Sequence, residues 1–554
     1  MFYILSFLWF IRTTKSILFW LYLWQLKEYH IGRFIDHFRT EKGKRIFINY
    51  FQFLKIFLIL GPFFFPLVFP PIIIFLYFAE SVIFFKNLFQ KRLLKPVLTK
   101  KITFLILSGL FFEVFFIFTS WFRPLPNFVL LLLVFDILTP AITSGIVFIF
   151  QPLAVLARNQ IIKKAKEKRA KVDELRSSSP SLSSPYAPRS VFKDLLVIGI
   201  TGSYGKTSTK EFLATILSQK YKVLKTAEHQ NSEVGISQCI LNDLKSEHEI
   251  FIVEMGAYNR GGIKLLCDIA KPKIGILTGI NEQHMATFGS QENIIKGKYE
   301  LIEFLPENGL AIFNGNNEYC HELYQKTKKS KKIIYNTIST AVENVLHKDF
   351  WAENIKVEKE WISFKVVSSD GDSADFKVIL LGAQNVENIL LATAAAKELG
   401  MSLEEISKAC EKIRQEQSGM RLIKTKDGLN IIDATYSANP DGVISHLEYL
   451  KVWPGKRVII MPCLIELGQA SKEVHKRIGQ KIGEICDLVI ITTKERFKEI
   501  KDGSASSPQG GAKEVLFIED PKEIFEKIKS FCKLNDVILL ESRVPKEVIE
   551  LLSK

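Results

Sequence analysis

The sequence predicts an α-helical membrane region followed by two α/β domains, and three observations support this division. The 554 residues carry a net charge of +15, but residues 1–190 hold 25 Lys and Arg against 9 Asp and Glu, whereas the other 364 hold 49 against 50. Of the 43 phenylalanines, 30 lie in the first 150 residues. From residue 192 onward, strand patterns alternate with helical ones, and strands are predicted at 195–200, 250–253, 274–277, 428–432, 457–461, 488–492, 514–518 and 536–541. Because the positive charge accompanies an apolar segment, it indicates a membrane and gives no support for nucleic-acid binding.

Four long apolar runs in the N-terminal region are candidates for transmembrane helices. They cover about 46–61, 67–85, 102–121 and 127–150, and several reach the roughly 20 residues that a helix needs to cross a bilayer. A fifth run, 2–24, is interrupted by Arg12 and Lys15. It is compatible with an interfacial helix, a tilted span or a half-hairpin. We therefore expect a multi-span transmembrane region at 1–156 with four or five segments.

The segments between these runs differ in charge, which predicts their orientation. Residues 27–45, 86–101 and 158–171 are rich in Lys and Arg. The alternate connections, 61–66 and 122–127, contain proline and are nearly uncharged. By the positive-inside rule the basic segments face the cytoplasm. The part of the chain that follows residue 158 is therefore expected in the cytoplasm.

Ionisable residues also lie within or at the ends of the apolar runs: Lys55, Glu80, Glu113 and Asp136. Inserting a charged side chain at the bilayer centre costs about 2.5–3.5 kcal/mol of free energy on insertion scales. Because of this cost, the first hypothesis for such a residue is a functional role. The alternative is that they pair between helices or extend to the membrane surface. Because they form no ordered chain that suggests an ion path, the sequence favours the alternative.

A phosphate-binding loop follows the membrane region and a Ser/Pro-rich stretch at 176–190, which we interpret as part of a linker at 157–191. Leu195–Ile200 predicts a buried strand, and Lys210–Gln219 predicts a helix. The TGSYGKTS segment between them would present backbone N–H groups at a helix N-terminus, which favours an anion. The pattern GxxxxGK[ST] would require glycine at position 200, so this is a variant loop. It predicts a P-loop ATPase-like central domain.

The loop and the segments that follow it resemble the motifs of the Mur ligases, the ATP-dependent amide-forming enzymes of bacterial cell-wall synthesis. The matching segments are Thr201–Ser208 (TGxxGKTS), Asn231–Gly235 (NNEIG), Glu254–Ala257 (E-[LM]-G-A), Asn281–Ser290 (N..H..FGS), Lys298–Glu300 (KxE), Asn314–Asn316 (NADD), Gly382–Asn388 (GxHNxxN), Asp433–Pro440 (DDSYNANP), Glu466–Gly468 (ELG) and Ser542–Arg543 (GSR). The resemblance covers about 192–550 and keeps the family's order. The YNANP, ELG and GSR types are typical of the member that joins D-alanyl-D-alanine to a muramyl tripeptide.

Four residues depart from these motifs. Gln384 stands where the family has His, and Ala434 stands where it has the second Asp of the DD pair. Ser437 replaces Asn, and Glu541 stands where the GSR motif has Gly. These positions are implied to contact the nucleotide and the acceptor, so the departures concern amine specificity more than amide formation.

The resemblance implies a role for each matching residue. The catalytic residues would be Lys206, Glu254, His284 and Lys298, and the ligands of two Mg²⁺ ions would be Thr207, Glu254, His284 and Lys298. In the family the lysine that matches Lys298 is carbamylated by CO₂. The alternative is a lysine on an exposed helix face, since Lys296 and Lys298 lie in one polar stretch. ATP would contact Gly202, Ser203, Gly205, Lys206, Thr207, Ser208, Asn388, Arg421 and Asp433. The substrates would contact Asn231, Tyr436, Asn439, Ser542 and Arg543. Two histidines, His229 and His446, have no motif around them and are interpreted as ordinary surface or core residues.

The resemblance further implies a central ATP-binding domain at 192–417 and a Rossmann-like C-terminal domain at 418–554, with the membrane region in place of the family's usual UDP-binding domain. We expect an ATP-dependent ligase at the bacterial inner membrane. It would activate a muramyl-peptide carboxylate, UDP- or lipid-linked, as an acyl phosphate and join it to D-Ala-D-Ala or a similar amine. Its partners would include membrane lipid and no nucleic acid. The alternatives are a membrane-bound ligase like a poly-γ-glutamate synthase, or a membrane scaffold with a degenerate ATPase domain.

Overall fold

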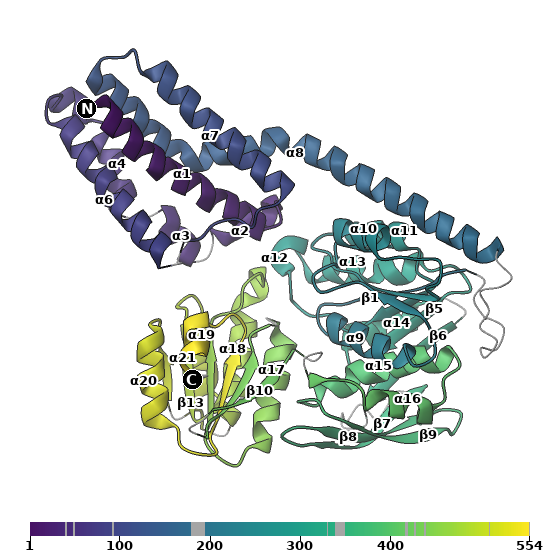
Figure 1. Cartoon of the computed structure of the whole chain (residues 1–554). Coiled ribbons are helices and arrows are strands. Elements are labelled where there is room, and N and C mark those ends of the chain that lie inside the picture. The colour runs from purple at the N-terminus through teal and green to yellow at the C-terminus, as the bar shows by residue number, and fades with distance from the viewer. Residues whose placement is uncertain are drawn as a thin grey trace. The chain divides into compact units, whose positions relative to one another are not determined.

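The computed structural model describes residues 1–38, 41–47, 50–90, 93–178, 194–328, 331–337, 349–415, 419–425, 428–436, 439–508, 510–512 and 514–552. These residues form two compact units, Met1–Gln160 and Ile161–Lys554 (Figure 1). The expected linker at 176–190 lies largely outside the described residues, because only its first three positions belong to a described helix.

The first unit is helical. Its helices are α1 (Phe2–Leu26), α2 (Ile31–His37), α3 (Glu41–Phe47), α4 (Tyr50–Leu58), α5 (Gly61–Phe64), α6 (Phe69–Phe89), α7 (Lys100–Ser120) and the first part of α8 (Leu125–Ser178). Among the described residues, five helical stretches are long and apolar enough to cross a membrane: Phe2–Leu26, Gly43–Phe64, Phe69–Phe89, Lys100–Ser120 and Leu125–Arg176. Of the four expected runs, 46–61 and 127–150 lie within two of these stretches, and 67–85 and 102–121 overlap two others but extend beyond them by two residues and one residue. The fifth run, 2–24, whose conformation the sequence did not decide, is part of a continuous helix of 25 residues.

Charged side chains of four of these helices pair inside the first unit. Lys55 Nζ lies 2.7 Å from Glu80 Oε2 and 2.6 Å from Asp136 Oδ2. Arg12 Nε lies 2.8 Å from Glu80 Oε1, and an Arg12 side-chain nitrogen lies 3.7 Å from Asp136 Oδ1. The helices α1, α4, α6 and α8 thus contribute two cations and two carboxylates, which offset the cost of burying each charge. Pairing between helices, the favoured interpretation of Lys55, Glu80 and Asp136, is confirmed.

The fourth ionisable residue, Glu113 of α7, is also buried, and its Oε2 accepts a hydrogen bond from Thr14 Oγ1 of α1 at 3.0 Å. Large apolar side chains on the same helices are exposed, including Phe75, Leu107 and Phe111. Polar groups inside and apolar groups outside are the arrangement that a bundle surrounded by lipid requires. The first unit therefore has the composition and polarity of a membrane bundle.

In the second unit, nine described strands form one sheet in the order β2-β3-β1-β4-β5-β6-β7-β8-β9. The strands are β1 (Leu196–Thr201), β2 (Val223–Lys225), β3 (Ile250–Glu254), β4 (Ile274–Leu277), β5 (Leu310–Asn314), β6 (Lys331–Thr337), β7 (Phe350–Val357), β8 (Ile362–Ser368) and β9 (Ser373–Val378). Neighbouring strands from β2 to β7 are parallel, and β8 is antiparallel to β7 and β9. The three strands expected before Thr201, Glu254 and Thr278 are confirmed as β1, β3 and β4.

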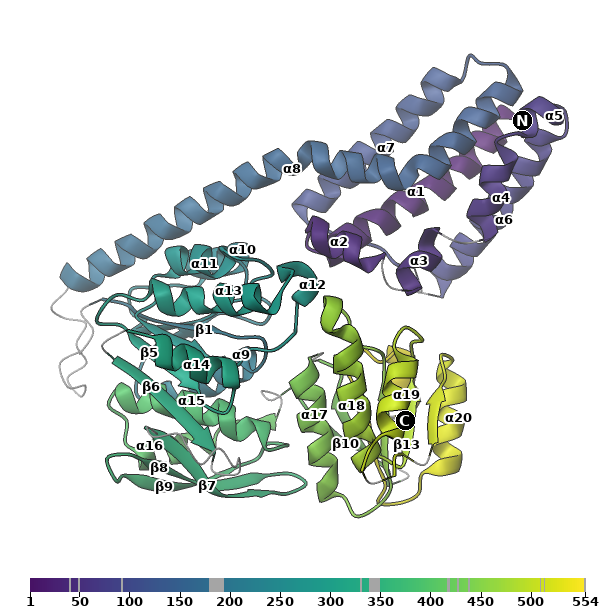
Figure 2. The ribbon, with the colours of Figure 1, turned by 180° about the vertical axis from the view of Figure 1, so that it is seen from behind.

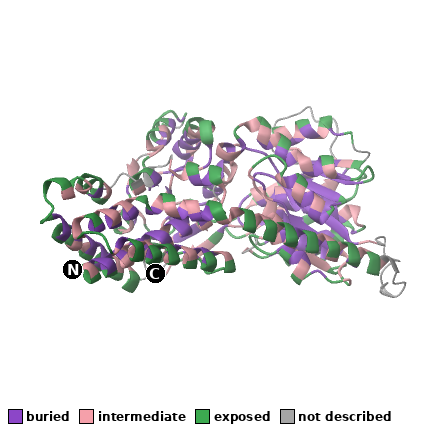
Figure 3. Ribbon diagram, turned by 90° about the horizontal axis from the view of Figure 1, so that it is seen from above, coloured by how far each residue is buried: buried purple, intermediate pink, exposed green. Residues whose placement is uncertain are grey.

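Helices cover both faces of this sheet, as Figure 1 and Figure 2 show for β1. They are α9 (Lys206–Leu217), α10 (Glu233–Asn242), α11 (Gly262–Ala270), α12 (Met285–Phe288), α13 (Gln291–Phe304), α14 (Glu318–Lys326), α15 (Gln384–Glu398) and α16 (Leu403–Cys410). Alternate residues of a strand point to opposite faces. Ile198 accordingly packs in the core with α9, α15 and α16, and Val197 packs with α10, α11 and α13. Strands β1, β3 and β4 are buried along their whole length, as continuous apolar runs predict, and Figure 3 shows the buried strands between the covering helices.

The end of α8 packs against this α/β domain. Ile162, Ala165 and Val172 are buried in the core that contains α10, α11 and α13. Lys166 pairs with Asp268, and Arg176 donates hydrogen bonds to two backbone carbonyls, at residues 246 and 248. The basic stretch that the sequence assigned to the linker is therefore helical to residue 178, and its contacts with the domain extend to Arg176.

Six further described strands form the C-terminal sheet, in the order β10-β11-β15-β12-β13-β14. They are β10 (Arg421–Lys424), β11 (Asn430–Ala434), β12 (Arg457–Met461), β13 (Leu488–Ile491), β14 (Glu514–Phe517) and β15 (Val537–Glu541), with helices α17 (Pro440–Tyr449), α18 (Ser471–Ile485), α19 (Phe497–Ala505), α20 (Pro521–Phe531) and α21 (Lys546–Leu552) and the short helices η2 (Leu450–Val452) and η3 (Gly468–Ala470). The five strands that the sequence predicted are confirmed. The edge strand β10 was not predicted, and because it runs antiparallel to β11 the sheet is mixed.

Candidate active site

The phosphate loop joins β1 to α9 and depends on two glycines for its shape. Gly205 has a φ of 74°, and a Cβ there would lie 2.6 Å from Asn388 Oδ1. A Cβ at Gly202 would lie 2.1 Å from Thr278 Oγ1. Lys206, the first residue of α9, turns back so that its Nζ donates to the Gly202 carbonyl oxygen at 2.8 Å. The loop thus brings a lysine to the N-terminus of a helix, the combination that favours phosphate.

Neighbouring residues hold the loop in place. The Ser203 N–H donates to the Gly279 carbonyl at 2.7 Å, and Ser203 Oγ accepts from the Asn281 N–H at 3.1 Å. Asn388, on α15, lies against the loop, where its Oδ1 accepts from Thr209 Oγ1 at 3.2 Å. Ser208 lies half-buried in the first turn of α9. The structure therefore brings the predicted nucleotide residues of the central domain together.

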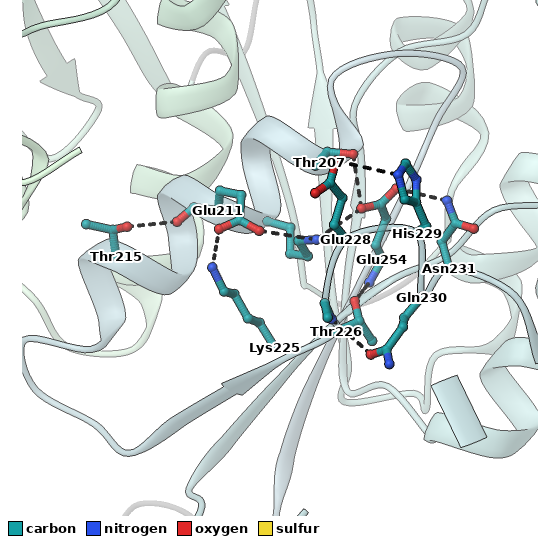
Figure 4. Close-up of polar contacts among 12 residues, drawn as sticks. Thr207, Glu211, Thr215, Lys225, Thr226, Glu228, His229, Gln230, Asn231 and Glu254 are labelled. Atoms are coloured by element: carbon teal, nitrogen blue, oxygen red, sulfur yellow. Dashed lines mark hydrogen bonds and ion pairs between the residues drawn. The ribbon is translucent and has the colours of Figure 1, made fainter. Parts of the chain in front are cut away.

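Glu254, at the end of β3, is the centre of a polar cluster beside this loop. Its Oε2 accepts from Thr207 Oγ1 at 3.1 Å and from Lys210 Nζ at 3.3 Å, and its Oε1 accepts from Asn231 Nδ2 at 3.1 Å. Figure 4 shows Thr207, Asn231 and Glu254 close together. Burial opposes ionisation of Glu254, but the charges of Lys206 and Lys210 outweigh it, so the pKa lies below its usual value. Glu254 is accordingly a charged, buried carboxylate.

His284 follows β4 and precedes the short helix α12. Its φ is 67°, and its Nδ1 lies 2.7 Å from Glu466 Oε2 in the C-terminal part of the second unit. The Ala286 N–H also donates to the Glu466 carbonyl, at 3.1 Å. Burial lowers the pKa of His284, and the Glu466 carboxylate partly offsets this. The ELG segment, matched only as a motif in the sequence, therefore fixes the orientation of the predicted catalytic histidine.

Lys298 lies on α13 with 1% of its surface exposed. Its Nζ donates to the Ala257 carbonyl oxygen at 3.4 Å and lies 5.6 Å from the centre of the Phe288 ring. Burial, and then the positive charge of Lys206, place the pKa of Lys298 well below its usual value. The alternative interpretation, a lysine on an exposed helix face, is therefore wrong. A buried lysine with a depressed pKa is available as a neutral amine.

The predicted contacts of the C-terminal domain lie at the same end of its sheet. Arg421, exposed on β10, is paired in register with Asp433 of β11. Asp433 Oδ1 accepts from Thr435 Oγ1 at 2.6 Å. Tyr436 follows with 54% exposure, and its pKa is raised by burial and by the carboxylates of Glu228 and Glu254. Tyr436 therefore lies within electrostatic reach of the Glu254 cluster.

Three further predicted residues lie nearby in the C-terminal domain. Asn439 caps α17, accepting from the Gly442 N–H at 2.9 Å, and its Oδ1 also accepts from Asn281 Nδ2 at 3.4 Å. Ser542 follows β15 with a φ of 60°, and Arg543 beside it is exposed. The Asn439 contact links this domain to the strand end that carries His284.

Two contributions to the site were not predicted from the sequence. Lys210 is fully buried and bonds Glu254. Its spacing of four from Lys206 places both lysines on one helix face, a signal that could have identified it. Glu466 was quoted only within a motif, although it binds His284.

No three His, Cys, Asp or Glu side chains converge as metal ligands within the described part of the chain.

Comparison with known sequences assigns both α/β domains of this chain. Residues 200–396 match the Mur ligase middle domain, and residues 420–543 match the Mur ligase, glutamate ligase domain. The chain belongs to the Mur ligase family. Members of this family are ATP-dependent ligases.

Individual relatives agree with this assignment. The UDP-N-acetylmuramoyl-tripeptide–D-alanyl-D-alanine ligase of Bacillus subtilis is 28% identical over 348 residues, which cover 62% of this chain and 72% of that protein. The enzyme of the same name from Escherichia coli is 30% identical over 285 residues, covering 51% of this chain and 61% of that protein. The crystal structure of MurF ligase from Thermotoga maritima in complex with ADP superposes with a TM-score of 0.58 at 25% identity, covering 72% of this Mur ligase and 83% of that chain. MurF from Acinetobacter baumannii has the same TM-score at 24% identity, covering 70% and 81%.

The geometry of the phosphate loop gives a direct prediction for Gly205. A Gly205→Ala variant should lose most of its affinity for ADP, because the new Cβ would displace Asn388 and distort the loop. Gly400→Ala is the matched control, since Gly400 has a φ of 82° and nothing within 4 Å of the Cβ position. Both variants place alanine in the left-handed region, at a cost of about 1–2 kcal/mol.

Titration calorimetry with ADP measures the loss of ADP affinity, and thermal unfolding measures the loss of stability. Both variants should lower the unfolding temperature, but only Gly205→Ala should weaken ADP binding. Equal ADP affinities for the two variants would contradict the assignment of this loop.

Proposed function

We propose that this Mur ligase is an ATP-dependent peptide ligase of cell-wall precursor synthesis that joins a muramyl-peptide carboxylate to D-Ala-D-Ala or a similar amine. The observation that carries the proposal is the Glu254 cluster, in which a phosphate loop, two lysines and a charged carboxylate meet at the ends of β1 and β3. The related enzymes named above support the choice of substrates. A degenerate scaffold would have no reason to retain this cluster of buried charges, because even a paired buried charge is often no more stable than well-packed apolar residues.

The reaction requires two anions to approach each other. A substrate carboxylate oxygen attacks the γ-phosphorus of ATP, ADP leaves, and an acyl phosphate forms. The amine then attacks the acyl carbon, phosphate leaves with the bonding electron pair, and the nitrogen loses a proton. Lys206 and the N-terminus of α9 are placed to stabilise the charge on the transferring phosphoryl group. Lys210 holds Glu254 in position, and Asn231 fixes its other oxygen.

The residues present fit Mg²⁺. Thr207 Oγ1 and Glu254 Oε2 lie 3.1 Å apart, and both are the oxygen ligands that Mg²⁺ prefers. Protein sites usually hold Mg²⁺ with one or two carboxylates, waters and substrate phosphates, so two protein ligands suffice. When bound, Mg²⁺ would neutralise phosphate charge. We propose His284 as a ligand of a second ion, because the Nδ1 hydrogen bond to Glu466 is the kind that orients a ligating imidazole.

The remaining predicted contacts are part of the same proposal. Asn388, Arg421 and Asp433 would contact the nucleotide, together with the phosphate loop from Gly202 to Ser208. The substrates would contact Asn231, beside Glu254, and four residues of the C-terminal domain: Tyr436, Asn439, Ser542 and Arg543. The contact of Asn439 with Asn281 supports this grouping, because it connects the acceptor side to the strand that ends near His284.

We propose that 1–156 form a multi-span region of a bacterial inner membrane, and that the ligase domains lie in the cytoplasm. The five apolar helices and the alternation of basic and uncharged connections support this orientation. The domains would be an ATP-binding domain at 192–417 and a Rossmann-like domain at 418–554, following a linker at 157–191. The membrane region would replace the UDP-binding domain, so the muramyl peptide would be UDP-linked or presented by a membrane lipid.

Sealed membrane vesicles test activity and orientation together. Inverted vesicles that contain the full chain, supplied with ATP, muramyl tripeptide and D-Ala-D-Ala, should form a product heavier by the dipeptide less one water. Right-side-out vesicles should form it only after detergent is added. Mass spectrometry measures the product, and ADP release measures ATP use.

The two parts of the proposal fail differently. If detergent-treated vesicles form no product with any amine of a panel, the proposed ligase function is wrong. If intact right-side-out vesicles alone form product, the function stands and the orientation is wrong.

The carbamate proposed for Lys298 gives a second prediction. Lys298→Ala should be inactive, because the anionic carbamate is missing, and short carboxylic acids in the buffer should restore part of the activity. Chloride at equal ionic strength should not, because the site needs an oxygen ligand and not screening. Lys298→Arg should also be inactive, because guanidinium keeps its charge and takes up no CO₂.

Lys296 provides the matched control on the same helix. Its side chain is exposed and pairs with Glu292 at 2.5 Å, so Lys296→Ala should keep its activity and show no response to added acids. Thermal unfolding verifies that each variant is folded. Near-normal turnover by Lys298→Ala or Lys298→Arg would exclude the carbamate.

A further inference from the structure

Two of the departures from the Mur ligase motifs lie side by side in the C-terminal sheet. Ala434 ends β11, where the motif has an Asp, and Glu541 ends β15, where the motif has a Gly. The two strands are parallel neighbours, and Ala434 and Glu541 are paired directly in register. Side chains at paired positions point to the same face, and the strands lie about 4.8 Å apart. The carboxyl group that is absent at 434 is thus matched by one at 541, on the same face and at the same level of the sheet.

The exchange also conserves space. A Gly at 541 would leave room for a carboxyl group at 434, and the small Ala434 leaves room for the longer Glu541. Both side chains are completely buried. Two carboxyl groups at these paired positions would repel each other, which explains why only one of the two is acidic.

Glu541 is hydrogen-bonded through both of its oxygens. The His446 ring donates from Nδ1 to Oε2 at 2.7 Å, and Ser542 Oγ donates to Oε1 at 3.2 Å. His446 lies on α17 with 6% of its surface exposed. A buried carboxyl group is costly unless its oxygens are satisfied in this way. His446, interpreted from the sequence as an ordinary residue, is therefore a core histidine with a specific carboxyl partner.

These contacts join three segments that are proposed to bind the acceptor. Through His446, Glu541 is connected to α17, whose first turn is capped by Asn439. Through Ser542 it holds the start of the Ser542–Arg543 pair, and the Ser542 N–H donates to the Ala434 carbonyl at 3.3 Å, next to the turn that carries Tyr436. Because Glu541 is completely buried, it acts on these segments and not on the substrate itself.

We propose that Glu541 is a positioning residue for the acceptor amine, and that its carboxyl group, through His446 and Ser542, holds the segments that carry Asn439 and Arg543. This inference rests on the proposed ligase function and identifies a determinant of its acceptor side. The phosphate loop and the Glu254 cluster are formed by other strands, whereas Asp433 of β11, next to Ala434, is proposed to contact the nucleotide. The positioning effect is therefore expected to be larger for the acceptor than for ATP.

A set of three variants of the full chain tests this proposal: Glu541→Gly, Ala434→Asp and the double variant. Glu541→Gly should raise KM for the acceptor roughly tenfold or more, since small displacements of positioning groups have effects of this size, while KM for ATP should change much less. Ala434→Asp alone should also be impaired, because it places two carboxyl groups side by side. The double variant restores one carboxyl group at this level of the sheet and should recover most of the acceptor affinity.

Glu541→Gln is the variant to measure if Glu541→Gly fails to fold. It keeps the size of the side chain and an accepting oxygen, so it should fold and show a smaller rise in acceptor KM. The proposal is overturned if the double variant is no better than the poorer single variant, or if acceptor KM and ATP KM change in parallel in Glu541→Gln. Absence of ligase activity in the unmodified chain in the same assay would instead refute the proposed function.

Discussion

The Glu254 carboxylate lies buried at the end of β3 and remains charged because Lys206 and Lys210 offset the cost of its burial. The rest of the candidate site depends on this balance. Thr207 is held toward Glu254 at the start of α9, and Asn231 is held there from the segment before α10. Lys206 also affects Lys298. Burial is the largest cause of the lowered pKa of Lys298, and the positive charge of Lys206 lowers this pKa further. The charge of Lys206 thus contributes both to the phosphate site and to the lowered pKa of Lys298.

Continuous buried strands were the most predictable elements. The apolar runs of β1, β3, β4, β12, β13 and β15 are bounded by polar residues, and their ends followed from the sequence to within one or two residues. β10 was not predicted because a strand of four residues is too short to show a clear apolar pattern, and because its two end residues are exposed. The docked end of α8 was missed because lysines surround its apolar positions, although Ile162, Ala165 and Val172 have helical spacing.

The site was predictable where its residues are close in sequence. The GKTS segment and the acidic residue at the end of the strand β3 predicted Lys206, Thr207 and Glu254 as site residues, and the structure places Thr207 against Glu254. Contacts between distant segments were not predictable in this way. His284 and Glu466 are 182 residues apart, and His446 and Glu541 are 95 apart. No local sequence pattern indicates such pairs, because they form only when the strand ends of the folded sheets come together.

The acyl phosphate is the chemical centre of the proposed reaction, and isotope labelling tests it most directly. A muramyl tripeptide labelled with ¹⁸O in its reacting carboxylate is incubated with the enzyme, ATP and D-Ala-D-Ala, and the released phosphate is analysed by mass spectrometry. If the carboxylate attacks ATP, one ¹⁸O atom must appear in each phosphate formed with product. Product formation with unlabelled phosphate would contradict the proposed mechanism.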